Sequence, residues 1–182
     1  MQGTSGHVFW IFGLSGAGKS TVAEALAQDL RQRHLPVLTL DGDILRNGLC
    51  HGLGFSDTDR AENLRRAAEV ARLGATSGLC VVASFITPLE AHRTLVRKIV
   101  GVEQLSLVWI DAPLEVCRQR DVKGLYAKAQ AGQIQQMTGM GSAFEKPFLT
   151  NLVLSTAIDP PGVSAAILMD FAGRRLSTPL QE

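Results

Sequence analysis

The sequence feature that most constrains the fold is a glycine-rich run, GLSGAGKST at Gly13–Thr21, placed directly after the apolar run HVFWIF at His7–Phe12. It matches the pattern G-x-x-x-x-G-K-[ST], in which glycines let successive main-chain N–H groups turn inward around a polyphosphate. A helix beginning near Lys19 adds the positive end of its dipole, Lys19 adds a mobile charge, and the Ser20 hydroxyl can ligate magnesium. The pattern predicts a loop between a strand and a helix that binds a nucleoside triphosphate or a close relative.

Short apolar runs rich in β-forming residues alternate along the chain with longer segments of helical periodicity. We predict strands over 7–12, 36–40, 79–85, 105–110 and 151–155, and helices over 19–34 and 60–77. Continuously apolar strands separated by helices are typical of a parallel sheet covered on both faces. No Gly-, Ser- or Pro-rich linker divides the sequence. We therefore expect one α/β domain over residues 1–182, with three layers and a mainly parallel five-stranded sheet between helices.

Composition narrows the class of protein. The chain has 18 Lys and Arg against 17 Asp and Glu, a net charge of +1, so nothing in its overall charge favours nucleic acid or an anionic membrane as a partner. The longest apolar runs are too short to span a bilayer, and the N-terminus does not resemble a signal peptide. Cys50, Cys80 and Cys117 form no CxxC pair, which favours free thiols in a reducing compartment. We expect a cytoplasmic protein with neither nucleic-acid nor membrane partners.

The second predicted strand ends in LDGD, which brings Asp41 and Asp43 to the carboxyl edge of the sheet, where ligands bind in such folds. Two carboxylates there suit a base for an acceptor hydroxyl and a partner of magnesium through water. The third strand ends near Ser84, where many triphosphatases carry a magnesium-binding carboxylate, and no NKxD-type guanine signature occurs. These features favour a small-molecule kinase. A turn in which an aspartate bonds its own backbone is an equal alternative for LDGD.

The segment after LDGD is rich in groups that bind anions and bases. Phe55 lies in a Gly-rich loop ahead of Ser56, a predicted helix N-cap, and an aromatic ring there can stack on a base. Arg60 and Asn63 lie three residues apart, so both project from one helical face. Arginine forks bind oxyanions, although a solvated basic helix start is the alternative. The arginines of this segment are Arg46, Arg60, Arg65 and Arg66.

Collinear motifs between about Val8 and Leu154 resemble those of the adenylylsulfate kinase family of P-loop kinases. They are GLSGAGKST, LDGD, LGFSDTDRAENLRR, SFITP, IDAPLEVCRQRDVKGLYAKAQAGQI and MTGMGSAFEKP. The combination of DR..EN..R with RDVKGLY is far more specific than the glycine-rich run alone. The resemblance implies the P-loop kinase fold and transfer of a phosphoryl group from ATP to the ribose 3′-hydroxyl of adenosine 5′-phosphosulfate, giving ADP and 3′-phosphoadenylyl sulfate.

The resemblance also implies the site residues. The catalytic residues would be Lys19, Asp43, Arg60 and Thr87. ATP would be bound by Gly13, Leu14, Ser15, Gly16, Ala17, Gly18, Lys19, Ser20, Thr21 and Arg120. Adenosine 5′-phosphosulfate would be bound by Asp43, Arg46, Phe55, Arg60, Asn63, Ile86, Thr87, Lys123 and Met137. Magnesium would be bound by Ser20 and, through water, by Asp43.

A mobile lid would cover the phosphates, and we expect it over residues 120–144, a polar stretch punctuated by glycine. A solvated surface helix is the alternative for that stretch. The resemblance further implies a homodimer and sulfate adenylyltransferase as a functional partner.

Three positions depart from the family pattern. Ile44 follows Asp43 where the family carries asparagine, Thr87 replaces a serine that is phosphorylated in some members, and Met137 replaces an aromatic residue. A threonine keeps the hydroxyl, but the departure puts a phosphoryl-carrier role in doubt, and in-line transfer needs no covalent intermediate. Two alternatives stay open: another P-loop metabolite kinase of the gluconate or shikimate type, and a nucleotide-binding partner of a sulfate-activating enzyme that has lost turnover.

Overall fold

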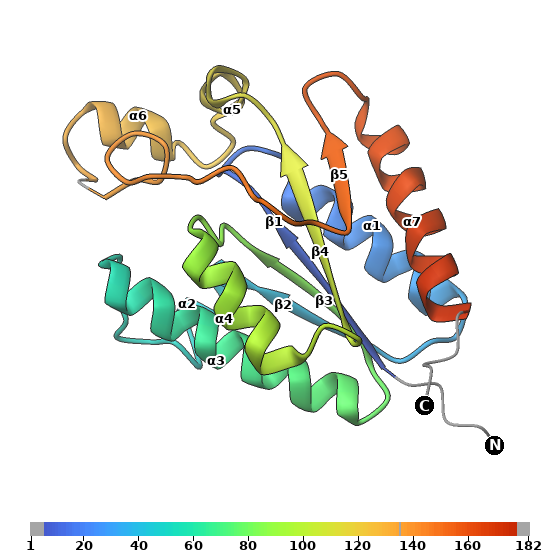
Figure 1. Ribbon diagram of the computed structural model, residues 1–182. Coiled ribbons are helices and arrows are strands. Elements are labelled where there is room, and N and C mark those ends of the chain that lie inside the picture. The colour runs from blue at the N-terminus through green and yellow to red at the C-terminus, as the bar shows by residue number, and fades with distance from the viewer. Residues whose placement is uncertain (1–5, 135, 178–182) are drawn as a thin grey trace.

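The computed structural model of the protein, which describes residues 6–134 and 136–177, contains a parallel sheet in the order β2-β3-β1-β4-β5 (Figure 1). Each predicted strand is present within one residue of its expected ends. The strands of the described sheet are β1 (His7–Phe12), β2 (Val37–Asp41), β3 (Cys80–Phe85), β4 (Leu105–Asp111) and β5 (Leu152–Ser155). The α/β fold class expected from the alternation of apolar runs and helices is confirmed.

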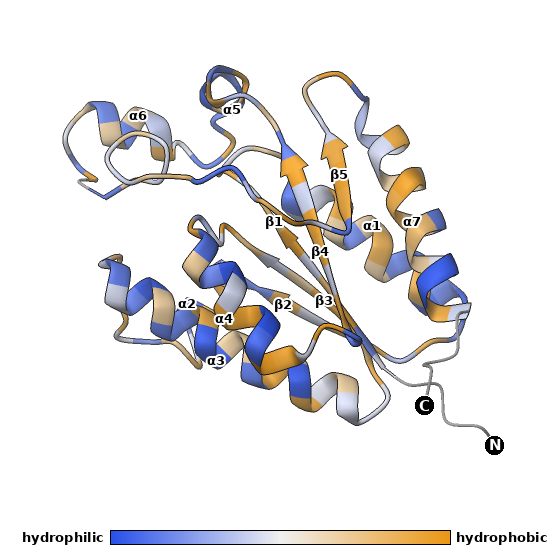
Figure 2. Cartoon of the chain, in the orientation of Figure 1, coloured by the Kyte–Doolittle hydropathy of each residue, from blue (hydrophilic) through white to orange (hydrophobic). Residues whose placement is uncertain are grey.

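Helices cover both faces of the sheet, as Figure 1 shows. Successive side chains of β1 point to opposite faces of the sheet. Phe9 and Ile11 pack toward α1 (Lys19–Gln32) and α7 (Pro161–Ser177), while Trp10 and Phe12 pack toward α3 (Asp57–Thr76) and α4 (Glu90–Val100). Figure 2 shows apolar residues concentrated on the strands and on the inner sides of these helices. The helices are α1 (Lys19–Gln32), α2 (Gly42–Arg46), α3 (Asp57–Thr76), α4 (Glu90–Val100), α5 (Leu114–Arg120), α6 (Leu125–Gln130) and α7 (Pro161–Ser177).

The two predicted helices are present with shifted ends. Helix α3 starts three residues earlier than expected because the Ser56 hydroxyl accepts a hydrogen bond from the Asp59 N–H at 3.1 Å, and Asp57 and Asp59 complement the dipole of the first turn. Helix α1 ends at Gln32, two residues early, because His34 takes a left-handed conformation with φ 59° ahead of Pro36. The predicted N-cap role of Ser56 is confirmed.

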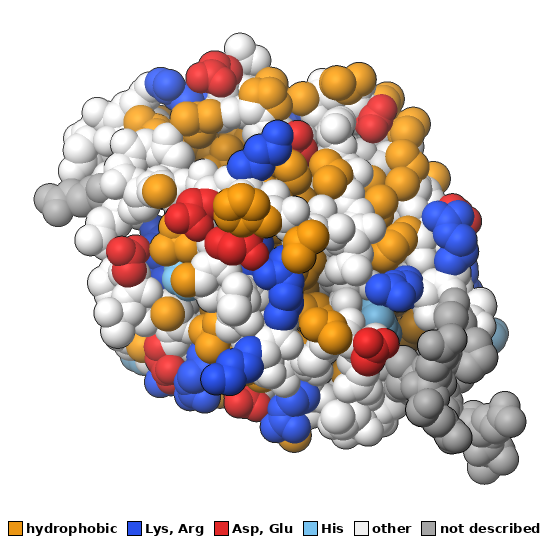
Figure 3. Space-filling model, in the orientation of Figure 1, with side chains coloured by type: hydrophobic (Ala, Val, Ile, Leu, Met, Phe, Trp, Pro, Cys, Tyr) orange, Lys and Arg blue, Asp and Glu red, His pale blue; other side chains and the backbone are white. Residues whose placement is uncertain are grey.

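Helices α5 and α6 and the loop after α6 lie beyond the carboxyl ends of the strands, at the upper left of Figure 1. This segment contains the stretch in which we expect a lid. In Figure 3, positive and negative side chains are interspersed over the visible face, in agreement with the net charge of +1. Within residues 6–134 and 136–177, no helix combines the length and the apolar character needed to cross a membrane. All three cysteines are buried free thiols.

Candidate active site

The glycine-rich run forms the connection between β1 and the N-terminus of α1. Gly16 has a φ of 75°, and a Cβ atom on it would lie 2.8 Å from the carbonyl oxygen of Cys117, so only glycine fits there. The ammonium group of Lys19 folds back and donates to the Leu14 carbonyl oxygen at 2.8 Å. The loop therefore has the conformation expected of a phosphate-binding cradle, with its lysine at the start of the helix.

The outer side of the cradle is held by residues that follow β4 and β5. Arg120, the last residue of α5, donates to the carbonyl oxygens of Gly16 at 3.4 Å and Ala17 at 3.5 Å, and to that of Thr156 at 2.6 Å. The Thr156 hydroxyl in turn donates to Ala17 at 2.6 Å. Arg120 thus joins the cradle to the loop after β5. Its side chain contacts the cradle's main chain from outside.

A cavity of about 310 Å³ opens beside this cradle and α1. Seven of the residues predicted to bind ATP line it, and the other three, Gly13, Leu14 and Ala17, do not. Ala17 is instead fully buried in the core beneath the loop, and the N–H of Gly13 donates to the Ile86 carbonyl oxygen at 3.3 Å. The lining residues are Ser15, Gly16, Gly18, Lys19, Ser20, Thr21, Val22, Arg120, Asp121, Val122, Lys123, Tyr126, Thr156, Asp159 and Pro161.

A larger cavity of about 630 Å³ adjoins the first. All nine residues predicted to bind the acceptor line it, although they come from four separate parts of the sequence. The two cavities share the side chains of Ser15, Lys19, Ser20 and Lys123. The two cavities therefore meet at the start of α1, beside the lysine of the glycine-rich run. The predicted acceptor residues are Asp43, Arg46, Phe55, Arg60, Asn63, Ile86, Thr87, Lys123 and Met137.

The two aspartates of LDGD have different surroundings. The carboxylate of Asp41 caps α2, accepting hydrogen bonds from the N–H groups of Asp43 at 2.9 Å and Ile44 at 3.4 Å. The turn alternative is therefore confirmed for Asp41. Asp43 projects into the larger cavity, where its carboxylate is paired with the ammonium group of Lys123. Both aspartates line the larger cavity, but the Asp43 carboxylate does not cap a helix.

Two of the four arginines reach the larger cavity. The guanidinium of Arg46 lies 4.3 Å from the centre of the Phe55 ring and donates to the carbonyl oxygens of Leu53 and Gly54. Arg60 is buried and donates to the Phe55 carbonyl at 2.9 Å and to the Gln136 carbonyl at 2.6 Å. Burial lowers the pKa values of both arginines. Phe55 itself is 56% exposed, so its ring is accessible from the cavity.

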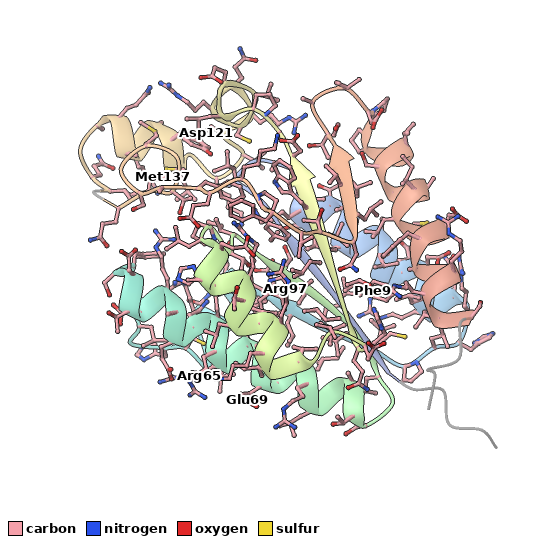
Figure 4. The ribbon with its side chains drawn as sticks, in the orientation of Figure 1. Phe9, Arg65, Glu69, Arg97, Asp121 and Met137 are labelled. Carbon is pink, nitrogen blue, oxygen red and sulfur yellow. The ribbon has the colours of Figure 1, made fainter. Side chains whose placement is uncertain are left out.

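The other two arginines, Arg65 and Arg66, do not belong to the site. Both pair with Glu62, at 2.7 Å in each case. Figure 4 places Arg65 on the outer side of α3, well away from Met137, and neither arginine lines the larger cavity. For these two residues the solvated-helix alternative is correct.

Buried polar groups complete the wall of the larger cavity. Asn63 is 4% exposed, and its side-chain oxygen has no hydrogen-bond partner within the described part of the chain. Thr87 is buried with a left-handed φ of 45°, and its hydroxyl oxygen accepts a hydrogen bond from the indole N–H of Trp10 at 2.9 Å. Met137 is also buried and lies at the edge of the cavity, on the segment after α6 (Figure 4).

The electrostatics of the junction between the two cavities favour an incoming anion. Burial and, secondarily, the positive charge of Lys123 lower the pKa of Lys19 from 10.5 to about 8. Because burial is unfavourable for a cation, a bound polyphosphate would stabilise the charged form of Lys19 by placing negative charge beside it. The negative charges of Asp41 and Asp43 raise the pKa of Lys19, but their effects are smaller.

Several residues that line the smaller cavity had no predicted role, and two of them, Tyr126 and Thr156, bond to the phosphate cradle. Tyr126 is almost fully buried in α6 and donates its hydroxyl hydrogen to the Ser15 carbonyl oxygen at 3.0 Å. It lies inside the quoted motif RDVKGLY but carried no predicted role. Thr156 directly follows β5, and the rule that ligands bind beyond the carboxyl ends of strands was the signal that could have found it.

The comparisons with known proteins agree with this geometry. The sequence model of the adenylylsulphate kinase family matches residues 5–155. The chain belongs to the adenylylsulfate kinase family. It is 46% identical over 170 residues to an adenylyl-sulfate kinase of Shewanella amazonensis, a match that covers 93% of this chain and 86% of the relative.

Solved structures of this family match in three dimensions as well. The APS kinase of Mycobacterium tuberculosis, determined in complex with AMPPNP and APS, is 42% identical, with a TM-score of 0.88 over 93% of this chain and 98% of that one. A gluconokinase of Sinorhizobium meliloti is 19% identical with a TM-score of 0.63, covering 94% and 93% of the two chains, and shares the fold alone. The protein is therefore a P-loop kinase of this family, and the comparisons favour this interpretation over a binding module without turnover.

Proposed function

We propose that this protein transfers the terminal phosphoryl group of ATP to the ribose 3′-hydroxyl of adenosine 5′-phosphosulfate, giving ADP and 3′-phosphoadenylyl sulfate. The observation that carries the proposal is the pair of adjoining cavities that meet at Lys19, Ser20 and Lys123. The smaller cavity accommodates the donor and the larger one the acceptor. Membership of the family supports the identity of both substrates.

The chemistry needs positioning and charge stabilisation rather than a covalent intermediate. A bond forms between the 3′-oxygen and the terminal phosphorus, while the bond from that phosphorus to the bridging oxygen of ADP breaks. Asp43 orients the hydroxyl and accepts its proton, after Lys123 has turned from Asp43 to the substrate phosphates. Lys19 and Arg60 spread the negative charge of the transition state.

The remaining acceptor residues bind and orient adenosine 5′-phosphosulfate. Arg46, Arg60 and Asn63 hold the phosphosulfate, while the exposed Phe55 ring stacks on the adenine and Met137 packs against it. Because Trp10 already fixes the Thr87 oxygen inside the cavity wall, we assign Thr87 an orienting role rather than that of a phosphoryl carrier.

Magnesium fits the residues at the junction. The exposed Ser20 hydroxyl at the start of α1 and the Asp43 carboxylate offer the oxygen ligands that magnesium prefers. When bound, the ion neutralises charge on the donor phosphates.

Three features of the wider assembly also belong to the proposal. We infer a single domain with residues 120–144 as a lid, a homodimer, and a functional link to sulfate adenylyltransferase. The buried free thiols support a reducing compartment such as the cytoplasm. Light scattering on the purified protein tests the dimer.

The deciding experiment is an ADP-release assay with ATP as donor and adenosine 5′-phosphosulfate, gluconate and shikimate as competing acceptors. We expect turnover with the nucleotide acceptor alone. Faster turnover with gluconate or shikimate would contradict the proposal, since those acceptors have no base for Phe55 to stack on.

A further inference from the structure

Arg93 is a fully buried arginine on α4 that lines neither cavity. A buried cation is unfavourable unless it is paired and its N–H groups are hydrogen-bonded. Here the Nε atom donates to a Glu90 carboxylate oxygen at 2.8 Å, which supplies the counter-charge. The rest of the guanidinium is directed at main-chain carbonyl groups. These carbonyls belong to the turn at Thr87 and Pro88, which lines the acceptor cavity, and to a segment that continues from the cavity-lining residues Met137 and Thr138.

The first of these segments is the turn after β3. Nη1 of Arg93 donates to the carbonyl oxygens of Thr87 at 3.1 Å and Pro88 at 3.2 Å, and both residues line the acceptor cavity. Thr87 has a left-handed φ of 45°, which a β-branched residue seldom adopts without support. Trp10 holds its side chain and Arg93 holds its carbonyl, so the conformation is fixed from both ends.

The second segment continues from Met137, which lines the cavity, to Glu145. Nη2 of Arg93 donates to the Glu145 carbonyl oxygen at 3.0 Å. The N–H of Glu145 donates to Pro88 at 2.9 Å, and its carboxylate accepts from the N–H of Glu90 at 2.6 Å. The segment is thereby attached to the turn after β3 and to the start of α4. Arg93 is the side chain that bonds to both segments at once.

We propose that Arg93 is a positioning residue that fixes the Thr87–Pro88 turn against the segment at Glu145 and so sets the shape of the acceptor cavity. This inference rests on the proposed function, because it takes that cavity as the site of adenosine 5′-phosphosulfate. The planar guanidinium reaches one carboxylate and three carbonyls together. A lysine ammonium at the same position keeps the charge but lacks the fork needed for this set of bonds.

The test compares Arg93→Lys with Arg97→Lys. Arg97 lies one turn further along α4 (Figure 4), also pairs with Glu90, and donates to the Leu149 carbonyl, but it bonds to neither Thr87 nor Pro88. For Arg93→Lys we expect the acceptor KM to rise at least about tenfold, since misplaced contacts at a substrate are costly. The KM for ATP should stay within about twofold, because the donor cavity has no contact with Arg93. We expect wild-type values of both constants for Arg97→Lys.

A second readout does not depend on turnover. The indole N–H of Trp10 bonds to Thr87, so its NMR resonance should shift in Arg93→Lys and remain in place in Arg97→Lys. Two tryptophans give two indole resonances, and Trp10→Phe assigns them. This readout separates the two proposals. Absence of wild-type turnover with adenosine 5′-phosphosulfate would contradict the proposed function, while an unshifted Trp10 resonance in Arg93→Lys would overturn the positioning role.

Glu145→Ala provides a variant on an exposed residue in case Arg93→Lys does not fold. It removes the carboxylate that bonds to Glu90 and should raise the acceptor KM in the same direction, by about two- to tenfold. An unchanged acceptor KM in folded Glu145→Ala and Arg93→Lys would overturn the proposal. An equal rise in the KM values of both substrates would also overturn it, because that result indicates general loosening of the protein.

Discussion

Tyr126→Phe removes one oxygen atom from the protein and tests how α6 supports the phosphate cradle. The Tyr126 hydroxyl donates to the Ser15 carbonyl at 3.0 Å, and its ring is almost fully buried in the core beside the cradle. Phenylalanine keeps the ring packed, so the change isolates the hydrogen bond. Tyr126 is the only tyrosine of the chain, which makes the variant easy to verify by absorbance.

The expected size of the effect depends on the Ser15 carbonyl, which loses its hydrogen-bond donor. A hydrogen bond contributes about 0.5–1.5 kcal/mol, and a carbonyl left without a partner in a buried site costs about 1–3 kcal/mol. We therefore expect a loss of about 1–2 kcal/mol, which lowers the Tm by roughly 2–8 °C for a chain of this size. If this free energy stabilises the ATP-binding conformation of the cradle, the KM for ATP rises by about 5- to 30-fold. The acceptor KM should change much less, because Tyr126 lines only the donor cavity.

The assay measures ADP release at saturating acceptor with ATP varied, together with thermal unfolding of the same preparation. Lys128→Ala is the matched control, since Lys128 lies exposed on the same short helix and lines neither cavity. Wild-type values of Tm and of the KM for ATP in Tyr126→Phe would refute the argument. A fall in Tm with an unchanged KM would show that the hydrogen bond stabilises the fold but does not contribute to ATP binding.

Three further predictions concern residues that line the larger cavity. Asp43→Asn should lower kcat by about 10²- to 10⁴-fold, the usual contribution of a general base, while equilibrium dialysis still detects acceptor binding; loss of binding with normal kcat would assign Asp43 to affinity instead. Phe55→Ala should raise the acceptor KM by about 5- to 100-fold because a base–aromatic stack contributes about 1–3 kcal/mol; an unchanged KM would show that the ring does not stack. Because the pKa of Lys19 in the free enzyme is lowered to about 8, kcat/KM for ATP should fall as the pH rises through that value and Lys19 loses its charge. A pH–rate profile checks this, and Lys123→Gln should move the fall to higher pH by removing the neighbouring positive charge.

The sequence predicted the fold well because its signals are local. Each strand carries an apolar run between turn residues, and the order of elements alone implies a parallel sheet. The predictions were less accurate where an end depends on a particular side chain, as at Ser56, or on a left-handed residue, as at His34. Periodicity does not contain that information.

The candidate site was predictable from motifs to the level of which residues line a cavity, but not which partners they have. Nothing in the spacing of LDGD shows that Asp41 caps a helix while Asp43 pairs with a lysine 80 residues later. Arg46 and Arg65 both lie in the arginine-rich segment after LDGD, and the sequence does not distinguish them. Only Arg46 lines the larger cavity, whereas Arg65 pairs with Glu62. The pairing of Arg93 with Glu90 has an ordinary helical spacing, but its bonds to Thr87, Pro88 and Glu145 could not be predicted, since they go to main-chain carbonyls, which every residue possesses.

The structure gives a physical reason for the donor and acceptor sites to be coupled. Within seven residues, the segment from Arg120 to Tyr126 contacts both sites: Arg120 and Tyr126 bond to carbonyls of the phosphate cradle, while Lys123 pairs with Asp43 in the acceptor cavity. The Asp121 carboxylate accepts hydrogen bonds from the N–H groups of Tyr126 and Ala127 at the start of α6, which links the turn that carries Lys123 to the helix that carries Tyr126. If a triphosphate draws Lys123 toward itself, as the proposed mechanism requires, the ion pair with Asp43 is released, so we expect binding of the donor to free the carboxylate that the acceptor would use.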